Sequence, residues 1–558
     1  MKRSAEEASL LDDEVATLHR VSMTASSSSS LSSSTTSKTK PLYRTLSTLT
    51  NNDETTSPRN KNSSPTFLTR FTNARILQRD GSLQRGELTV DSNTGIITQI
   101  HLDSQLQQAA EDVTNNAIIH DDNPQISHTV DCQGMILSPG FIDIQLNGAY
   151  GIDFSNGGCQ QQQELDYDCD AEKDDNDTNG SLCIDDIFQV ATSLCQSGVT
   201  SFCPTMVSSS RDTYRRVIPL IDRARRQQQQ QLLNRQQQQN DNKNTKVGAN
   251  ILGMHLEGPF FDGSKRGAHD ERHILAPSKG IDTVREVYGL NDNENNSMNM
   301  DISSSPMLEN IDIITLAPEL EGALDATKSI TQTSSASEHN VVVSCGHTGA
   351  TYEDGLQAIS HGATLLTHLF NAMNPFHHRK PGLVGLLSSK SKLASMGLQR
   401  PFYSLIVDGI HVHESAVSMA YNSHPDGCVL VTDAMSAMGL GDGTHALGDM
   451  SVSIQGDRAV LAGTDTLAGS VVSMDTCVRR FRKFTGCSTG KALLCATLHP
   501  ANVLNRSGKW ESRDGVIEAP IGVLEVGARA DLVVVTDELD VVATWVHGRV
   551  ANYCSTSL

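Results

Sequence analysis

The chain has no apolar stretch long enough to cross a lipid bilayer, and its N-terminus lacks the apolar segment of a secretory signal. Residues 1–20 carry five acidic side chains, which is unlike a mitochondrial presequence. The twelve cysteines are scattered without a CxxC pair, a pattern of free thiols rather than of disulfides or a zinc ribbon. These absences predict a cytoplasmic protein that is not associated with a membrane.

Positive charge is also scarce. The 44 Lys and Arg residues face 65 Asp and Glu residues, and the net charge of −21 argues against nucleic acid or an anionic membrane as main partner. Only 37% of the residues are hydrophobic, because Ser, Gln, Asn and Asp are concentrated in a few stretches. A chain of 558 residues still has room for a large core and more than one domain.

The polar stretches indicate where the folded parts begin and end. Residues 1–66 are rich in Ser and Thr and are predicted to be a disordered tail. Three further stretches are predicted to be insertions without an inferred role. They are an acidic segment near 160–180, a Gln-rich segment near 227–245 and an Asn/Ser/Asp segment near 290–306.

Short strand-like segments separated by turn residues occupy 67–137 and return at 505–558, so we expect both chain ends to form one small β-sandwich. Between them, residues 138–504 alternate strand-like and helix-like segments, which is typical of a (β/α)8 barrel. The predicted barrel strands are GFIDIQL, TSFCPT, ILGMHL, ITLAPE, NVVVSCG, ATLLTHL, YSLIVDG and CVLVTDA. The predicted fold class is therefore α/β, a TIM-type barrel with a β-sandwich.

Side chains that can bind metal or transfer protons follow four of these strands. His347 and His368 come after VVVSC and ATLLT, while the motifs HLEGP and VTDAM place Glu257 and Asp433 after two other strands. A lone histidine at a strand end is more often a structural residue. However, the carboxyl ends of barrel strands face the active site, and four such groups at one face favour a functional site.

The motifs around these residues resemble those of the N-acetylglucosamine-6-phosphate deacetylases of the amidohydrolase superfamily. The similarity runs from about Phe71 to Ala551 and rests on SPGFIDIQLNG, HLEGPF, GHTGAT, THLFNAMNPF, DGIHV and VTDAM, in the order of the family. It implies a metal-dependent hydrolase that converts N-acetyl-D-glucosamine 6-phosphate to D-glucosamine 6-phosphate and acetate. Such a step belongs to amino-sugar catabolism or recycling.

The resemblance implies one divalent metal ion per subunit, bound by Glu257, His347 and His368. Two imidazoles and one carboxylate are a ligand set typical of catalytic zinc, so we expect Zn²⁺. Asp433 is similar to the general base of the family, which takes a proton from water and passes it to the leaving amine. A helix N-cap is the alternative interpretation of Asp433.

One departure from the wider superfamily concerns the number of metal ions. Many members carry His-x-His after PGFID, which supports a second metal ion. Here the two positions are Gln145 and Asn147, whose neutral amides are weak ligands. We therefore expect a single metal ion.

The resemblance also implies residues that contact the substrate. Arg379 matches an arginine that binds the phosphate, a role suited to its planar donor fork, and in the family it reaches across a homodimer interface. His411, in DGIHV, is similar to a histidine that contacts the sugar. The full implied set is Ala268, Asn371, Ala372, Arg379, His411, Leu467, Ala468 and Gly469. The neighbouring His255, His269, His377, His378 and His413 are not included, and we expect His255 and His413 to point away from the site.

Two other functions stay open. The chain could be an amidohydrolase that acts on another N-acyl sugar or a cyclic amide, although Arg379 favours a phosphorylated substrate. It could also be a barrel that serves as a scaffold after losing catalysis. The presence of Glu257, His347, His368 and Asp433 argues against this second alternative.

Overall fold

The computed structural model describes most of the chain from residue 67 to residue 553. The described ranges are 67–103, 126–156, 181–238, 247–290, 310–336, 340–447, 450–508, 511–513 and 516–553. The predicted tail at 1–66, the insertion near 160–180 and all but the first residue of that near 290–306 lie outside these ranges.

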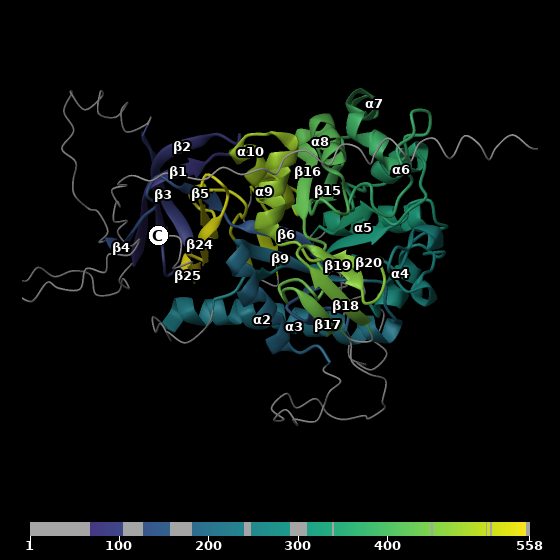
Figure 1. Ribbon diagram of the computed structural model, residues 1–558, viewed down its shortest axis with the longest axis horizontal. Coiled ribbons are helices and arrows are strands. Elements are labelled where there is room, and N and C mark those ends of the chain that lie inside the picture. The colour runs from purple at the N-terminus through teal and green to yellow at the C-terminus, as the bar shows by residue number, and fades with distance from the viewer. Residues whose placement is uncertain are drawn as a thin grey trace, which may run out of the picture. The chain divides into compact units, whose positions relative to one another are not determined.

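Eight parallel strands form a nearly closed barrel sheet (Figure 1). Each overlaps one predicted segment, and seven of the eight are buried at every residue, as expected when both faces of a parallel sheet are covered. The fold class is therefore confirmed. The strands are β6 (Phe141–Leu146), β9 (Val199–Met206), β11 (Met254–Glu257), β12 (Ile311–Leu316), β13 (Val342–Cys345), β14 (Leu365–Leu366), β15 (Phe402–Ile406) and β16 (Cys428–Val431).

The barrel closes between its first and last strands. Leu146, at the end of β6, forms a parallel bridge with Ala434, just beyond β16. The backbone N–H of Asp433 donates to the carbonyl oxygen of Gln145 at 2.9 Å. Closure therefore brings Gln145 and Asp433, which are far apart in the sequence, into contact.

Helices connect the successive strands, as in other βα folds. They include α2 (Ile184–Leu194), α3 (Arg211–Gln238), α4 (Ile281–Tyr288), α5 (Ala323–Ala336), α6 (Tyr352–Ser360), α7 (Lys390–Ser395), α8 (Glu414–Ser423), α9 (Met474–Thr485), α10 (Thr489–Leu494) and α11 (Leu498–Val503). The helix α3 contains the first part of the Gln-rich segment. There the side chain of Gln228 donates to the Ala249 carbonyl and accepts from the Ile251 N–H, both at 2.9 Å. This glutamine thus binds the backbone just before and within the short strand β10 (Asn250–Ile251).

Both chain ends contribute to one eight-stranded sheet beside the barrel, where a small β-sandwich was predicted. Strand β5 joins the two ends, because it pairs with β1 in parallel and with β23 in antiparallel fashion. The aromatic rings of Phe71 and Trp545, one from each chain end, pack edge to face with centroids 5.0 Å apart. The strands are β1 (Leu68–Leu77), β2 (Leu83–Asp91), β3 (Ile96–Leu102), β4 (Ile126–Asp131), β5 (Ile136–Pro139), β23 (Leu532–Val535), β24 (Val541–Val546) and β25 (Arg549–Tyr553).

A small antiparallel sheet lies between β16 and α9, where no strands were predicted. It consists of β17 (Gly443–Leu447), β18 (Met450–Gln455), β19 (Arg458–Leu461) and β20 (Leu467–Ser470). Its buried residues, among them Val452 and Ala459, form a small core with Ala437. A bridge from Ser470 to Ala434 attaches β20 to the segment that carries Asp433.

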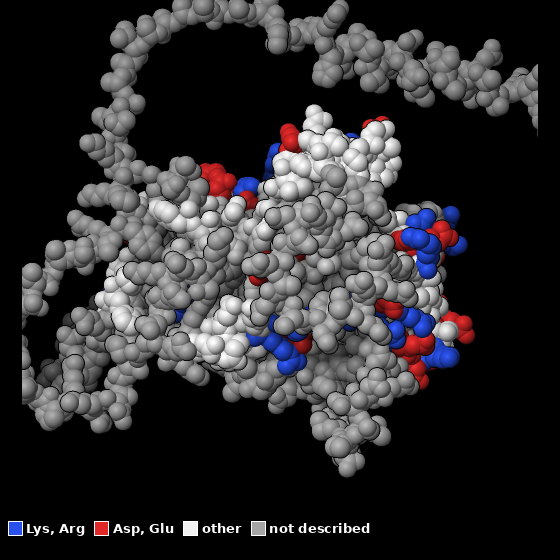
Figure 2. Space-filling model, turned by 90° about the horizontal axis from the view of Figure 1, so that it is seen from below, with Lys and Arg blue, Asp and Glu red and all other residues white. Residues whose placement is uncertain are grey.

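The surface carries charges of both signs. On the face drawn in Figure 2, basic and acidic side chains of the described residues lie next to one another. Elsewhere on the surface, opposite charges also pair: Arg211 and Glu286 form an exposed ion pair at 2.6 Å. None of the described helices has the length and apolarity that a membrane span requires.

Candidate active site

Four predicted site residues lie at the carboxyl ends of barrel strands. Glu257 is the last residue of β11, and His347, His368 and Asp433 each lie two residues beyond a strand end. The last three have positive φ angles of 49°, 31° and 45°, a left-handed conformation that costs side-chain-bearing residues of order 1–3 kcal/mol each. Such strain persists where the surroundings impose it, and it is common at functional sites.

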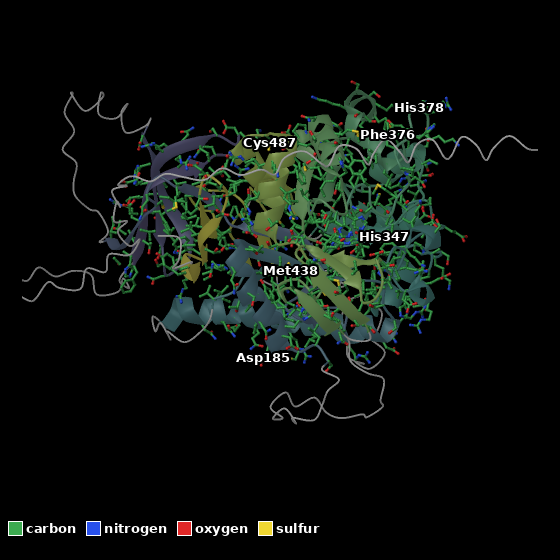
Figure 3. The ribbon with its side chains drawn as sticks, viewed as in Figure 1. Asp185, His347, Phe376, His378, Met438 and Cys487 are labelled. Carbon is green, nitrogen blue, oxygen red and sulfur yellow. The ribbon has the colours of Figure 1, made fainter. Side chains whose placement is uncertain are left out.

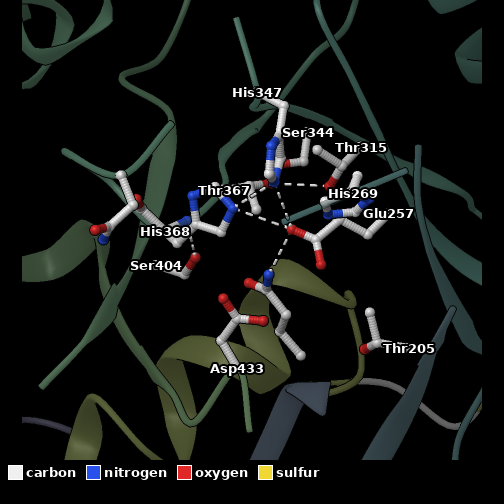
Figure 4. A network of polar contacts seen from close by, with 12 residues as sticks. Thr205, Glu257, His269, Thr315, Ser344, His347, Thr367, His368, Ser404 and Asp433 are labelled. Carbon is white, nitrogen blue, oxygen red and sulfur yellow. Dashed lines mark hydrogen bonds and ion pairs between the residues drawn. The ribbon is translucent and has the colours of Figure 1, made fainter. Parts of the chain in front are cut away.

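Glu257, His347 and His368 point at a common centre (Figure 4). Oε1 of Glu257 lies 3.2 Å from Nε2 of His347 and 3.0 Å from Nε2 of His368, and the two Nε2 atoms are 2.9 Å apart. In a tetrahedral zinc site with bonds of about 2.0–2.1 Å, neighbouring ligand atoms lie about 3.3 Å apart. The three atoms therefore form a triangle close to one face of such a tetrahedron, and the donor set fits a divalent cation.

Further contacts hold these three side chains in place. Nδ1 of His347 lies 3.0 Å from the carbonyl oxygen of Lys265, so Nδ1 carries the proton and Nε2 presents its lone pair. The side chain of Gln145 donates to Oε1 of Glu257 at 2.8 Å. Gln145 is thus a hydrogen-bond partner of the carboxylate. Nδ1 of His368 is buried and has no hydrogen-bond partner among the described residues.

The electrostatics favour an ionised Glu257. Burial disfavours its carboxylate, but the imidazoles of His347 and His368 beside it outweigh burial and hold the pKa well below its usual value. Burial lowers the pKa of His347, which favours the neutral, metal-binding form of the imidazole. An anionic oxygen is therefore available next to imidazole nitrogens, as metal binding requires.

His269 lies beside the triangle, although sequence reasoning did not include it. Glu257, His269 and His347 each offer a ligand atom within 4.8 Å of the others, a looser group than the triangle with His368. We prefer His368 as the third ligand because Nδ1 of His269 already accepts from the backbone N–H of Ser208 at 3.1 Å. Burial lowers the pKa of His269 to about 3, so its ring is neutral and its Nε2 carries the proton. His269 is thus a neutral N–H donor whose ring centroid lies 4.6 Å from that of His347.

Asp433 lies on the open side of the triangle, with its carboxylate turned toward it (Figure 4). Burial raises the pKa of this carboxyl to about 7, and the charge of Glu257 adds to the rise. The side-chain amide of Asn147 donates to Oδ1 at 2.7 Å. A turn and the strand β17 follow Asp433, so it does not cap a helix.

Comparisons with known proteins identify the family of the chain. Residues 136–551 match the Amidohydrolase family. The chain belongs to the amidohydrolase family. It is 37% identical to the N-acetylglucosamine-6-phosphate deacetylase of Danio rerio over 88% of this chain and 98% of that protein. Identity to the human enzyme of the same name is 36%, over 86% and 94% of the two chains. The N-acetylglucosamine-6-phosphate deacetylase of Thermotoga maritima has a similar structure, with a TM-score of 0.57, 26% identity and coverage of 87% of this chain and all of that one.

His411, another histidine of this amidohydrolase, lies beside the buried carboxylate of Asp408. Oδ2 of Asp408 is 2.5 Å from Nδ1 of His411, and Oδ1 accepts from the backbone N–H groups of Ile410 and His411, both at 2.8 Å. Burial lowers the pKa of His411, but the hydrogen bond and charge of Asp408 outweigh burial and raise it. Asp408 therefore fixes the ring and favours a protonated imidazole with Nε2–H free to donate.

Of the other predicted substrate residues, Ala268, Asn371 and Ala372 lie on loops after barrel strands, and three lie on strand β20. The Ala372 carbonyl accepts from the backbone N–H of Thr348 at 3.0 Å, which ties the segment after His368 to the segment after His347. Ala268 is exposed and directly precedes His269. Asn371 and Ala372 are half-buried, as are Leu467, Ala468 and Gly469 on β20.

Arg379 lies elsewhere. It belongs to an exposed loop, and among the described residues it forms no ion pair. Figure 3 shows Phe376 and His378 of this loop at the edge of the ribbon, whereas His347 lies inside. Phe376 is 53% exposed. Within one chain, Arg379 is therefore not gathered with the metal-binding triangle.

His255 and His413 are not ligands. Nε2 of His255 lies 2.7 Å from Oγ1 of Thr315 and Nδ1 lies 3.0 Å from the Ile144 carbonyl, so the ring points into the barrel interior. We expected His255 to point away from the site; its side chain lies on the same strand face as that of Glu257, two residues later, and both of its ring nitrogens have partners in the barrel interior. His413 is exposed and caps helix α8 by accepting from the Ser415 N–H at 3.2 Å.

Proposed function

We propose that this amidohydrolase removes the acetyl group of N-acetyl-D-glucosamine 6-phosphate and releases D-glucosamine 6-phosphate and acetate. The observation that carries the proposal is the triangle of Glu257, His347 and His368 with Asp433 beside it, at the carboxyl face of a barrel. Relatives of this name match nearly their whole length at 36–37% identity, which supports the same substrate.

The metal ion would be held by Glu257, His347 and His368, and we propose zinc because of the mixed imidazole and carboxylate set. When bound, it would polarise the acetyl carbonyl and lower the pKa of a water molecule toward neutrality. Gln145 and the Lys265 carbonyl hold two of the three ligands in position. With Gln145 bonded to Glu257, the structure supports a single ion.

Asp433 would move the proton. Its carboxylate takes a proton from the attacking water as the new C–O bond forms, and returns it to the nitrogen as the C–N bond breaks. Acetate and an amine leave, and Asp433 is again ionised. A pKa raised toward neutrality suits this exchange, because the group has to accept and release a proton in turn.

The remaining residues would bind and orient the sugar. The neutral N–H of His269 can donate to the acetyl oxygen as negative charge develops there. Nε2 of His411, whose Nδ1 is held by Asp408, can donate to the sugar or to the carbonyl. The surrounding loops would line the substrate pocket through Ala268, Asn371, Ala372, Leu467, Ala468 and Gly469.

The phosphate requires a cation, which we propose comes from a second subunit. Arg379 lies on an exposed loop away from the triangle of its own chain, and the loop also exposes Phe376. Both features support a homodimer in which this loop packs on the partner subunit and Arg379 binds the phosphate there. A bidentate contact between arginine and phosphate would be worth on the order of 2–4 kcal/mol.

The test of the activity is acetate release from N-acetylglucosamine 6-phosphate, measured with and without a chelator. We expect turnover that the chelator abolishes and added zinc restores. Unphosphorylated N-acetylglucosamine and a cyclic amide serve as comparison substrates, and faster turnover of either would favour another amidohydrolase activity. A protein that binds metal but hydrolyses none of the three would be a scaffold.

The dimer has its own test. Arg379→Ala should lower kcat/KM for the phosphorylated sugar by about thirty- to a thousandfold, with little further loss for the unphosphorylated one. Mixing Arg379→Ala chains with Asp433→Asn chains should restore activity, because one site of each mixed dimer is then intact. If mixed dimers form and stay inactive, Arg379 does not act across the interface. Lys380→Ala, the adjacent exposed cation, is the matched control.

A further inference from the structure

We propose that Asn147 binds the leaving nitrogen of the substrate and orients it toward Asp433. This inference rests on the deacetylase function proposed above. Asn147 follows β6 and faces Asp433 across the closure of the barrel. Its backbone N–H donates to the Ala434 carbonyl at 2.9 Å, and its Nδ2 donates to Oδ1 of Asp433 at 2.7 Å.

The chemistry of the contact fixes the orientation of the Asn147 amide. An ionised carboxylate can only accept hydrogen bonds, so the NH₂ group of Asn147 has to face Asp433. The oxygen Oδ1 then points to the other side. This atom is buried and has no hydrogen-bond partner among the described residues. Burying a hydrogen-bond acceptor without a partner is unfavourable, so we expect Oδ1 to accept a hydrogen bond from a donor group of the bound substrate.

The acetamide group of the substrate brings one such donor, its N–H. During cleavage the nitrogen has to direct its lone pair at the proton held by Asp433 while its own N–H points elsewhere. Asn147 can satisfy both requirements, because one end of its amide holds Asp433 and the other end can hold the N–H. The same oxygen can accept from the amine once the C–N bond is broken.

Gln145 provides a matched comparison two residues earlier on the same strand. Its amide donates to the metal ligand Glu257 at 2.8 Å. We therefore expect Gln145 to support metal binding through Glu257, whereas Asn147 binds the leaving nitrogen of the substrate. The two amides stand where other superfamily members carry metal-binding histidines, and they serve two different carboxylates.

The test compares the amide substrate with its oxygen analogue, 2-O-acetylglucose 6-phosphate, in which an ester oxygen replaces the N–H. In Asn147→Ala the loss of the bond to Asp433 affects both substrates, but only the amide also loses the contact with its N–H. We expect kcat/KM to fall about five- to thirtyfold more for the amide than for the ester, mainly through kcat. Zinc content, measured by elemental analysis, should stay at the wild-type level.

Gln145→Ala is the control, and it should weaken zinc binding and lower both activities equally. Asn147→Ser is a milder change that serves if the alanine variant does not fold, as judged by thermal unfolding. Equal losses for amide and ester in a folded, zinc-loaded Asn147 variant would overturn this inference and leave the proposed function standing. A wild-type protein that hydrolyses neither substrate would overturn both.

Discussion

Replacing Asp408 by Asn tests how the fold controls His411. Asp408 is buried, and its carboxylate accepts from Nδ1 of His411 at 2.5 Å; the His411 side chain is only 18% exposed. A hydrogen bond between charged groups in such a place is worth about 1.5–3 kcal/mol. Because this hydrogen bond and the charge of Asp408 raise the pKa of His411, Asp408→Asn should lower that pKa. The pKa falls because the substitution removes the anion that stabilises the protonated imidazole of His411.

The consequences are measurable in two ways. The pKa of His411 can be followed by NMR titration of the imidazole, with His411→Gln to assign the signal. The basic limb of kcat/KM should move to lower pH by the same amount, and kcat/KM above neutral pH should fall about ten- to a hundredfold. Glu414→Gln removes an exposed charge three residues from His411 and should shift neither quantity much. An unchanged His411 pKa in Asp408→Asn would refute the reasoning.

Three further predictions concern the base, the metal and stability. Asp433→Asn should lower kcat by roughly two to four orders of magnitude without changing metal content, and near-normal turnover would show that another group takes the proton. Elemental analysis should give about one zinc per chain, lost in His347→Ala, whereas a reproducible ratio of two would contradict a single-ion site. Asp312→Ala should destabilise the fold by about 1.5–3 kcal/mol in denaturant unfolding, because the buried Arg506 loses the carboxylate at 3.0 Å and keeps the longer ion pair with Glu518 at 3.6 Å; an unchanged stability would contradict this.

The sequence by itself determined the barrel and the residues at its strand ends. Apolar runs of strand length alternate with helical segments, and the rule that parallel barrel strands share one functional face then groups Glu257, His347, His368 and Asp433. Local patterns sufficed here because each of these side chains is placed by its own strand. The sequence after Asp433 did not predict the strands β17 to β20, because they are short and follow a Gly-rich stretch with little apolar alternation.

Only the tertiary structure decided which partners these four residues have. Gln145 on β6 contacts Glu257 on β11 across 112 positions of sequence. Asn147 contacts Asp433 across 286 positions, because closing the barrel sets β6 against β16. No local pattern encodes such a pairing, since it depends on the register and closure of the whole sheet. The sequence could say that Gln145 and Asn147 are weak metal ligands, but folding alone turned their amides toward two carboxylates. The same holds for His269, whose ring lies next to His347 because a loop after one strand packs against the end of another.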